Sequence, residues 1–238
     1  MSKPRSKTKK RPVAKRRTAK APKVETKTPA TLAPGRVLLL RTCTAEMHGT
    51  NSHSQHFTWP KSGRVACPDW NPQPCCGGGL HGLLWGEGKA DLLLWEDSAV
   101  WIVFEADADK VVEITEDGGG KCKVPECDVV CCGTRYEATS YLVARAPGRV
   151  VHGALITAGY SGTATAGYSG TATAGDRGTA TAGYSGTATA GYRGIVQVKW
   201  WDDKNNRYRI ATGYVGEDGI EKGKKYRADE TGKLVEVK

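Results

Sequence analysis

The first thirty residues lack aromatic side chains, apolar runs and any acid other than Glu25. Without an apolar run the segment is neither a secretory signal nor a membrane span, so we expect a cytoplasmic chain with no membrane partner. A composition this poor in hydrophobic residues does not bury enough surface to fold. Residues 1–35 are therefore predicted to be a disordered basic arm.

The arm is strongly cationic. Its twelve lysines and arginines against one acid give +11, while the whole chain is +10, so the remainder sums to −1. Such an arm either keeps the chain soluble or binds phosphates non-specifically, with a steep salt dependence. No aromatic residue alternates with the cations, so stacking on bases and sequence-specific recognition are not predicted. The cations expected to contact nucleic acid are Lys9, Lys10, Arg11, Lys15, Arg16 and Arg17.

Motifs for catalysis and for metal binding are also scarce. The sequence has no Walker-type phosphate loop, no Ser-His-Asp order and no paired carboxylates. Its eight cysteines include the pairs Cys75-Cys76 and Cys131-Cys132, which are adjacent, whereas structural zinc usually takes ligands at C-x2-C or similar spacing. We therefore expect reduced, buried thiols without metal or cofactor, and we favour a protein that is not an enzyme.

Residues 36–147 are predicted to form a compact α+β domain. The apolar run Ala99–Ala106 alternates without a polar face, which is typical of a strand buried on both sides within a sheet. Pro60 and Gly63 separate two short apolar pieces, which predicts a hairpin or a turn with flanking strands. The stretch from Arg135 to Ala146 fits a short helix and a strand face about equally well.

Residues 148–194 contain one octad, G-T-A-T-A-G-Y-S in consensus, repeated five times. Threonine and alanine alternate as in a β-strand, and the glycines permit tight turns. A strand that carries only methyl groups inside has almost no core, so the fixed period predicts stacking on copies of itself. We predict an all-β solenoid with two octads in each coil, alanine inside and threonine outside.

A solenoid leaves open strand edges at both ends, and these edges recruit further strands unless they are covered. The α+β domain precedes the first octad and is expected to cover one end. Residues 195–238 read as two β-hairpins, the first turning at Asn205-Asn206, and are expected to form a C-terminal cap.

The predicted solenoid offers two candidate sites. Its turns place Tyr160 and Tyr192 along one edge, with Asp176 between them, and Tyr168 with Tyr184 along the other. We expect the chain to self-associate through these edges. Its outward threonines form an array that would face ice or a partner, composed of Thr163, Thr165, Thr171, Thr173, Thr179, Thr181, Thr187 and Thr189.

The octads, followed by WWDDKNNRYR and GYVGEDGIE, resemble the repeats and C-terminal cap of bacterial ice nucleation proteins over roughly residues 154–226. The resemblance implies a β-solenoid whose threonine face orders water and whose tyrosine edge associates. Arrays in that family hold dozens of repeats, however, and five octads make too small a face to nucleate ice. Weak ice binding is the most that the resemblance implies here.

The region before the octads carries a second resemblance. The stretch Cys76–Gly86 reads C-G-G-G-L-H-G-L-L-W-G and is similar to a stretch in bacterial and phage proteins that place short octad arrays after such a domain. That resemblance implies no particular activity.

One enzymatic alternative follows from spacing. Arg41, the turn that holds His81 and the later Glu105 resemble the arrangement that lines a nicotinamide pocket in ADP-ribosyltransferase folds. The alternative requires the three side chains to converge on one open cleft, because acid-base and binding groups must reach a shared substrate. The sequence otherwise favours a structural or interaction protein, in which the solenoid is a rigid, self-associating spacer.

Overall fold

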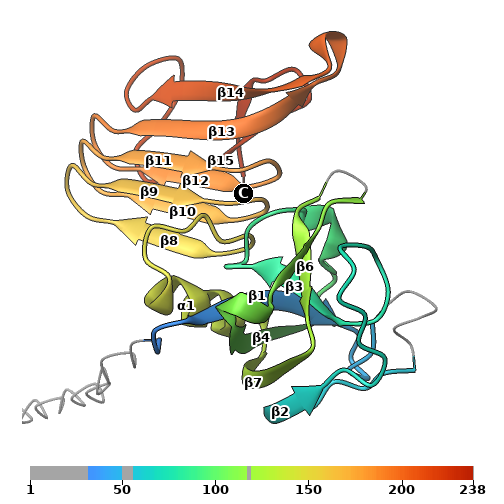
Figure 1. Ribbon diagram of the computed structural model, residues 1–238. Coiled ribbons are helices and arrows are strands. Elements are labelled where there is room, and N and C mark those ends of the chain that lie inside the picture. The colour runs from blue at the N-terminus through green and yellow to red at the C-terminus, as the bar shows by residue number, and fades with distance from the viewer. Residues whose placement is uncertain (1–31, 50–55, 117–118, 238) are drawn as a thin grey trace, which may run out of the picture.

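The computed structural model describes residues 32–49, 56–116 and 119–237 of the chain. It is built mostly of β-sheets with one α-helix, as the sequence predicted in outline (Figure 1). The arm predicted at residues 1–35, including all its proposed nucleic-acid contacts, lies outside the described residues except for its last four. In Figure 1 the N-terminal sheet lies below a stack of repeat strands, and α1 sits at their junction.

The N-terminal body is a seven-stranded antiparallel sheet with the order β2-β7-β4-β1-β3-β6-β5. Strands β6 and β7 are separated along the chain only by Pro125, although β4, β1 and β3 lie between them in the sheet. The sheet must therefore curl so that these two strands approach each other. Its strands are β1 (Arg36–Cys43), β2 (Gly63–Ala66), β3 (Leu80–Leu84), β4 (Val100–Asp107), β5 (Val112–Ile114), β6 (Lys121–Val124) and β7 (Glu126–Gly133).

Strand β4 confirms the prediction of a strand buried on both faces. Ile102 and Phe104 join the core inside the curl, whereas Trp101 and Val103 join a second core under α1. The sequence predicted a hairpin or a turn with flanking strands around Pro60. Strand β2 follows this turn, but it pairs with β7, so the hairpin alternative is wrong. The segment before Pro60 is held by a buried side chain rather than by a strand ladder, since the Trp59 ring packs 5.2 Å from Phe104.

Residues Arg135–Arg145 form the helix α1, which settles the alternative left open by the sequence. Thr134 begins the helix with a capping box, in which its hydroxyl accepts from the Glu137 amide and the Glu137 carboxylate accepts from the Thr134 amide. Arg145 interrupts the apolar stripe without cost to packing, because its guanidinium lies 3.6 Å from the centroid of the Tyr141 ring. Short 3-10 helices are η1 (Ala90–Leu92), η2 (Ala108–Lys110) and η4 (Asp203–Asn205).

The octad strands form two parallel sheets that face each other. Each of the first four strands pairs in register with the strand sixteen residues further on, so that Thr171 lies between Leu155 and Thr187. One sheet contains β8 (Leu155–Ala158), β10 (Thr171–Ala174) and β12 (Thr187–Ala190). The other contains β9 (Thr163–Ala166), β11 (Thr179–Ala182) and β13 (Ile195–Asp202).

Alanine fills the space between the two sheets. The eight alanines of β9 to β12 are at most 4% exposed, and Val196 and Val198 continue the same core. Each turn repeats one backbone conformation, with a left-handed residue before the glycine that precedes the next strand. These left-handed residues are Ser161, Ser169, Arg177, Ser185 and Arg193.

Both ends of the stack are covered. At the lower end Ala154 and Ile156 pack with Leu142 of α1 and with Trp101 of the N-terminal body. At the upper end β14 (Arg207–Tyr214) pairs antiparallel with β13, and β15 (Tyr226–Ala228) pairs with β12 and with β16 (Leu234–Glu236). Within the described residues, no helix is long and apolar enough to span a bilayer.

Candidate functional site

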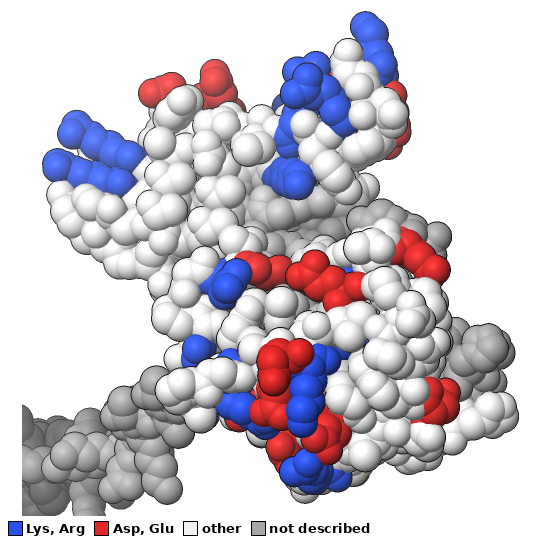
Figure 2. Space-filling model, in the orientation of Figure 1, with Lys and Arg blue, Asp and Glu red and all other residues white. Residues whose placement is uncertain are grey.

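The threonines of the two sheets point away from the alanine core. Thr163 and Thr165 of β9 are exposed, and Thr179 and Thr181 of β11 lie beside them in register. Between 154 and 194 the only charged residues are Asp176, Arg177 and Arg193, which all lie in turns. Figure 2 accordingly shows an almost uncharged surface over the repeat strands, with Lys and Arg gathered at the far turns and at the cap.

The opposite sheet carries a similar array, since Thr179 and Thr181 of β11 are partly buried as well. Thr171, Thr173, Thr187 and Thr189 are all partly buried, and the Thr187 hydroxyl donates to the Thr171 hydroxyl at 3.2 Å. The Thr189 hydroxyl oxygen is fully buried and has no hydrogen-bond partner among the described residues. Thr189 was expected in the outward array, but its hydroxyl is covered in the structure, where it adjoins Ala188, the residue that β15 pairs with.

One turn edge of the stack carries a continuous ladder of aromatic rings, here called the inner edge. The rings of Tyr168 and Tyr184 lie 5.8 Å apart between centroids. Below them Trp95 lies 5.0 Å from Tyr168, and above them Tyr208 lies 5.8 Å from Tyr184. Contacts of this length suit tilted and edge-on ring pairs.

The inner edge links the whole molecule. Its ladder ends on Trp101 in the N-terminal core, 5.3 Å from Trp95, and on Trp201 in the cap, 4.8 Å from Tyr208. The sequence indicated only the pair Tyr168 and Tyr184, because the other four rings do not belong to the octad period. The WW dipeptide at the start of the cap was the available signal for the upper end.

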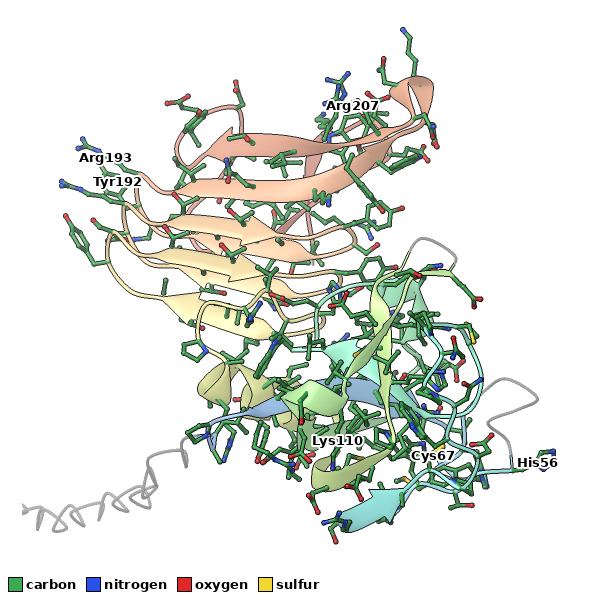
Figure 3. The ribbon with its side chains drawn as sticks, viewed as in Figure 1. His56, Cys67, Lys110, Tyr192, Arg193 and Arg207 are labelled. Carbon is green, nitrogen blue, oxygen red and sulfur yellow. The ribbon has the colours of Figure 1, made fainter. Side chains whose placement is uncertain are left out.

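The opposite turn edge, here called the outer edge, has no such ladder. Tyr160 and Tyr192 are 67% and 52% exposed, and Asp176 lies between them in the stack. The Asp176 carboxylate accepts a hydrogen bond of 2.7 Å from the Tyr192 amide, so this residue closes a turn instead of adding a ring. Arg177 and Arg193 lie over the Tyr160 and Tyr192 rings, and Figure 3 shows Tyr192 and Arg193 projecting away from the N-terminal body.

The structure places two of the three residues of the ADP-ribosyltransferase hypothesis at one cavity and the third elsewhere. Arg41 and His81 both line one cavity of about 480 Å³, and the Arg41 guanidinium donates to the His81 carbonyl at 3.3 Å. Glu105 does not line that cavity, since its carboxylate binds Arg36 at 2.7 Å. Arg41 pairs with Ile102 across β1 and β4, and Glu105, three residues further along β4, lies on the other face of the sheet. The predicted three-residue cleft is therefore wrong.

The thiols of the N-terminal body have no arrangement suited to a metal. Burial raises the pKa of Cys122 and of Cys127 to about 12, and it also raises the pKa of Cys43, Cys131 and Cys132. A thiol must lose its proton to bind zinc or to attack a substrate. Over residues 32–49, 56–116 and 119–237, no three His, Cys, Asp or Glu side chains are grouped to hold an ion.

Comparison with known proteins finds relatives for part of the chain. No protein-family profile matches it, and no solved structure matches it. An ice nucleation protein of Xanthomonas campestris pv. translucens is 34% identical over 114 residues, which are 47% of this chain and 7% of the relative. Ice nucleation protein InaU of Pantoea ananas is 36% identical over 45% of this chain and 10% of its own length.

A third relative is similar in extent. The ice nucleation protein of Pseudomonas syringae is 34% identical over 46% of the chain and 9% of the relative. This chain therefore spans at most a tenth of the length of these relatives. The similarity supports repeats of the kind found in ice nucleation proteins.

Proposed function

We propose that the chain is a non-enzymatic structural protein built around a short β-solenoid of two octads per coil. The observation that carries this proposal is the register: pairs sixteen residues apart recur in both parallel sheets, from Leu155 to Gln197. The similarity to ice nucleation proteins supports the same repeat. Repeats that contact only their neighbours and are capped at both ends make a stiff rod.

The rod acts as a spacer between the N-terminal body and the cap. The inner edge supports this role, because its ring ladder is continuous from Trp101 to Trp201. The Trp95–Tyr168 and Tyr184–Tyr208 contacts each join the rod to a different part of the chain. The distance between the two ends is then set by the number of octads.

The rod self-associates sideways, through its outer edge. End-to-end stacking is opposed because the N-terminal body and the cap cover the two ends. Tyr160 and Tyr192 remain exposed along the outer edge, each with an arginine over its ring. Aromatic and arginine side chains are the residues that contribute most to the centres of protein interfaces.

The test is the mass of the full chain in solution as a function of concentration, measured by light scattering after size exclusion. We expect the wild type to form dimers or larger assemblies, and the double variant Tyr160→Ala, Tyr192→Ala to be a monomer at the same concentration. Tyr184→Ala changes a tyrosine of the inner edge and should leave association intact. A wild type that stays monomeric, or a double variant that still assembles, would contradict the proposal.

Weak ice binding is the second candidate, favoured by the names of the relatives and by the threonine array of β9 and β11. Threonine methyls and hydroxyls are spaced there by the strand repeat, with rungs about 4.8 Å apart. We expect the intact chain to shape growing ice crystals. Thr163→Lys with Thr179→Lys should abolish the effect, whereas Thr171→Lys with Thr187→Lys on the other sheet should retain it. Unshaped crystals with the wild type would end this candidate.

A further inference from the structure

The cavity that Arg41 and His81 line is built from several separate parts of the N-terminal body. Strands β1 and β3 form its floor, and the segments around Cys67–Asp69, Cys76–Gly79 and Leu92–Leu94 form its walls. Its volume, about 480 Å³, is in the range of cavities that hold small organic ligands. His56 and Cys67, which both line it, lie on one side of the body in Figure 3.

The first argument for a ligand is that Arg41 forms no ion pair with an acidic side chain of the described residues. The Arg41 guanidinium donates to the Cys43 sulfur and to the His81 carbonyl and lies 4.8 Å from the Trp59 ring centroid. No ion pair joins it to an acid in the described part of the chain. Arg36 on the same strand, in contrast, pairs with Glu105, Asp107 and Asp128. A partly buried guanidinium with donors to spare suits an anion.

The second argument is that further cations face the same space. Lys121 lines the cavity, and its ammonium donates to the Cys76 sulfur at 2.9 Å. Lys123 lies behind it, fully buried, and donates to the carbonyls of Cys75 and Gly77. Burial and the charges of Lys121, Arg41 and Lys123 lower the pKa of His81 to about 4, so its ring is neutral at pH 7.

One acid faces this group of cations. Asp69 lines the cavity, and its carboxylate accepts a hydrogen bond of 3.0 Å from the Cys67 thiol. Arg41 and Lys121 therefore exceed it by one charge among the lining residues. Beside the cavity, Lys123 adds a cation and Glu116, whose carboxylate accepts from the Cys76 amide at 2.9 Å, adds an acid, so the excess of one positive charge remains. A low-dielectric cleft that carries excess charge of one sign concentrates ligands of the opposite sign.

The third argument is the shape and chemistry of the walls. Phe57 contributes a partly buried aromatic ring, which lies 5.7 Å from the buried ring of Trp59 behind it. Pro68 and the leucines 92–94 add apolar surface around them. Such walls favour a flat organic body beside the charged group rather than a bare inorganic ion.

We propose that this cavity binds a small organic anion, a phosphate or carboxylate joined to a flat aromatic body, with Arg41 and Lys121 holding the anionic group and with Phe57 and the leucines 92–94 contacting the ring system. The proposal is independent of the rod and its self-association, because it uses only side chains of the N-terminal body. It requires no chemical step from the protein.

The test is calorimetric titration of the full chain at about 0.15 M salt, where screening limits non-specific contacts with the basic arm. The probes are adenosine 5′-monophosphate and 2-naphthoate, with adenosine and inorganic phosphate as partial probes. We expect at least one aromatic anion to bind one to one with a Kd below about 1 mM, and both partial probes to bind about tenfold more weakly, because each lacks one of the two recognised parts.

Matched variants locate the site. Arg41→Gln and Lys121→Gln should each weaken binding about tenfold, since each removes one charge-assisted contact. Lys222→Gln removes the same charge from an exposed position on the cap and should bind like the wild type. If Arg41→Gln does not fold, Lys121→Gln decides the matter alone. The proposal is overturned if neither aromatic anion binds, if adenosine binds as tightly as its monophosphate, or if the cavity variants bind like the wild type.

Discussion

Replacing Gly183 by alanine is expected to lower the free energy of unfolding by about 3 kcal/mol, a large effect for a single methyl group. A Cβ atom at Gly183 would lie 2.5 Å from the carbonyl carbon of Gly167, 2.6 Å from its oxygen and 2.7 Å from the amide nitrogen of Tyr168. All three atoms belong to the backbone of the adjacent coil, so no side-chain rotation relieves the contact. The coils must separate locally, which weakens the inter-strand hydrogen bonds beside the turn.

Gly159 supplies a matched control, because it occupies the same octad position in the first coil. A Cβ atom there would meet no other atom within 4 Å. Gly159→Ala should therefore change stability by less than about 0.5 kcal/mol. Thermal unfolding followed by circular dichroism should show the Gly183 variant melting about 10 °C below the wild type and the Gly159 variant unchanged. Equal melting temperatures for the two variants would mean that the coils are not stacked at this distance.

The contrast between these two glycines also shows which features of the stack could be predicted from the octad sequence. Period, alternation and turn residues are local properties of each unit, so strands, turns and an alanine interior could be predicted from the letters alone. That Gly183 must be glycine, while Gly159 need not be, depends on the coil below, which only the stacked structure supplies. The same holds for Thr189, whose octad predicts an outward hydroxyl and whose surroundings bury it.

The N-terminal body was less predictable because its pairings are long-range. The apolar run at β4 could be predicted, since burial on both faces selects apolar residues from Val100 to Phe104. The pairing partner of β2 could not be predicted from the sequence, because β7 lies more than fifty residues further on. The nearby Pro60 and Gly63 favoured a local hairpin instead. The Arg41 guanidinium reaches the His81 carbonyl because β1 pairs with β3, whereas the Glu105 side chain lies on the other face of the sheet from Arg41.

The second large effect concerns pH and rests on His81. We expect the wild type to lose about 3 kcal/mol of unfolding free energy between pH 6.5 and pH 4 through this one group. The imidazole has an ordinary pKa of 6.5, and in the fold burial, followed by the charges of Lys121, Arg41 and Lys123, lowers that pKa to about 4. Between the two values the unfolded chain binds a proton that the folded chain does not, so stability falls as the pH falls through this window and levels off below it.

Denaturant unfolding at pH 7 and pH 4 gives the loss of unfolding free energy for each protein. The contribution of His81 is the loss in the wild type minus the loss in His81→Gln. Carboxylates whose pKa is lowered by their partners, such as Asp107 and Asp202, also lose stabilisation as the pH falls, but they do so equally in both proteins. His152, which burial likewise shifts to a lower pKa, is present in both as well. The glutamine variant should therefore lose about 3 kcal/mol less than the wild type over this range.

His56→Gln, which removes an exposed histidine at the rim of the same cavity, should lose as much as the wild type. If His81→Gln and His56→Gln lose the same unfolding free energy between pH 7 and pH 4, His81 is not held neutral by burial and neighbouring cations. The excess positive charge inferred for the cavity would then have one argument fewer.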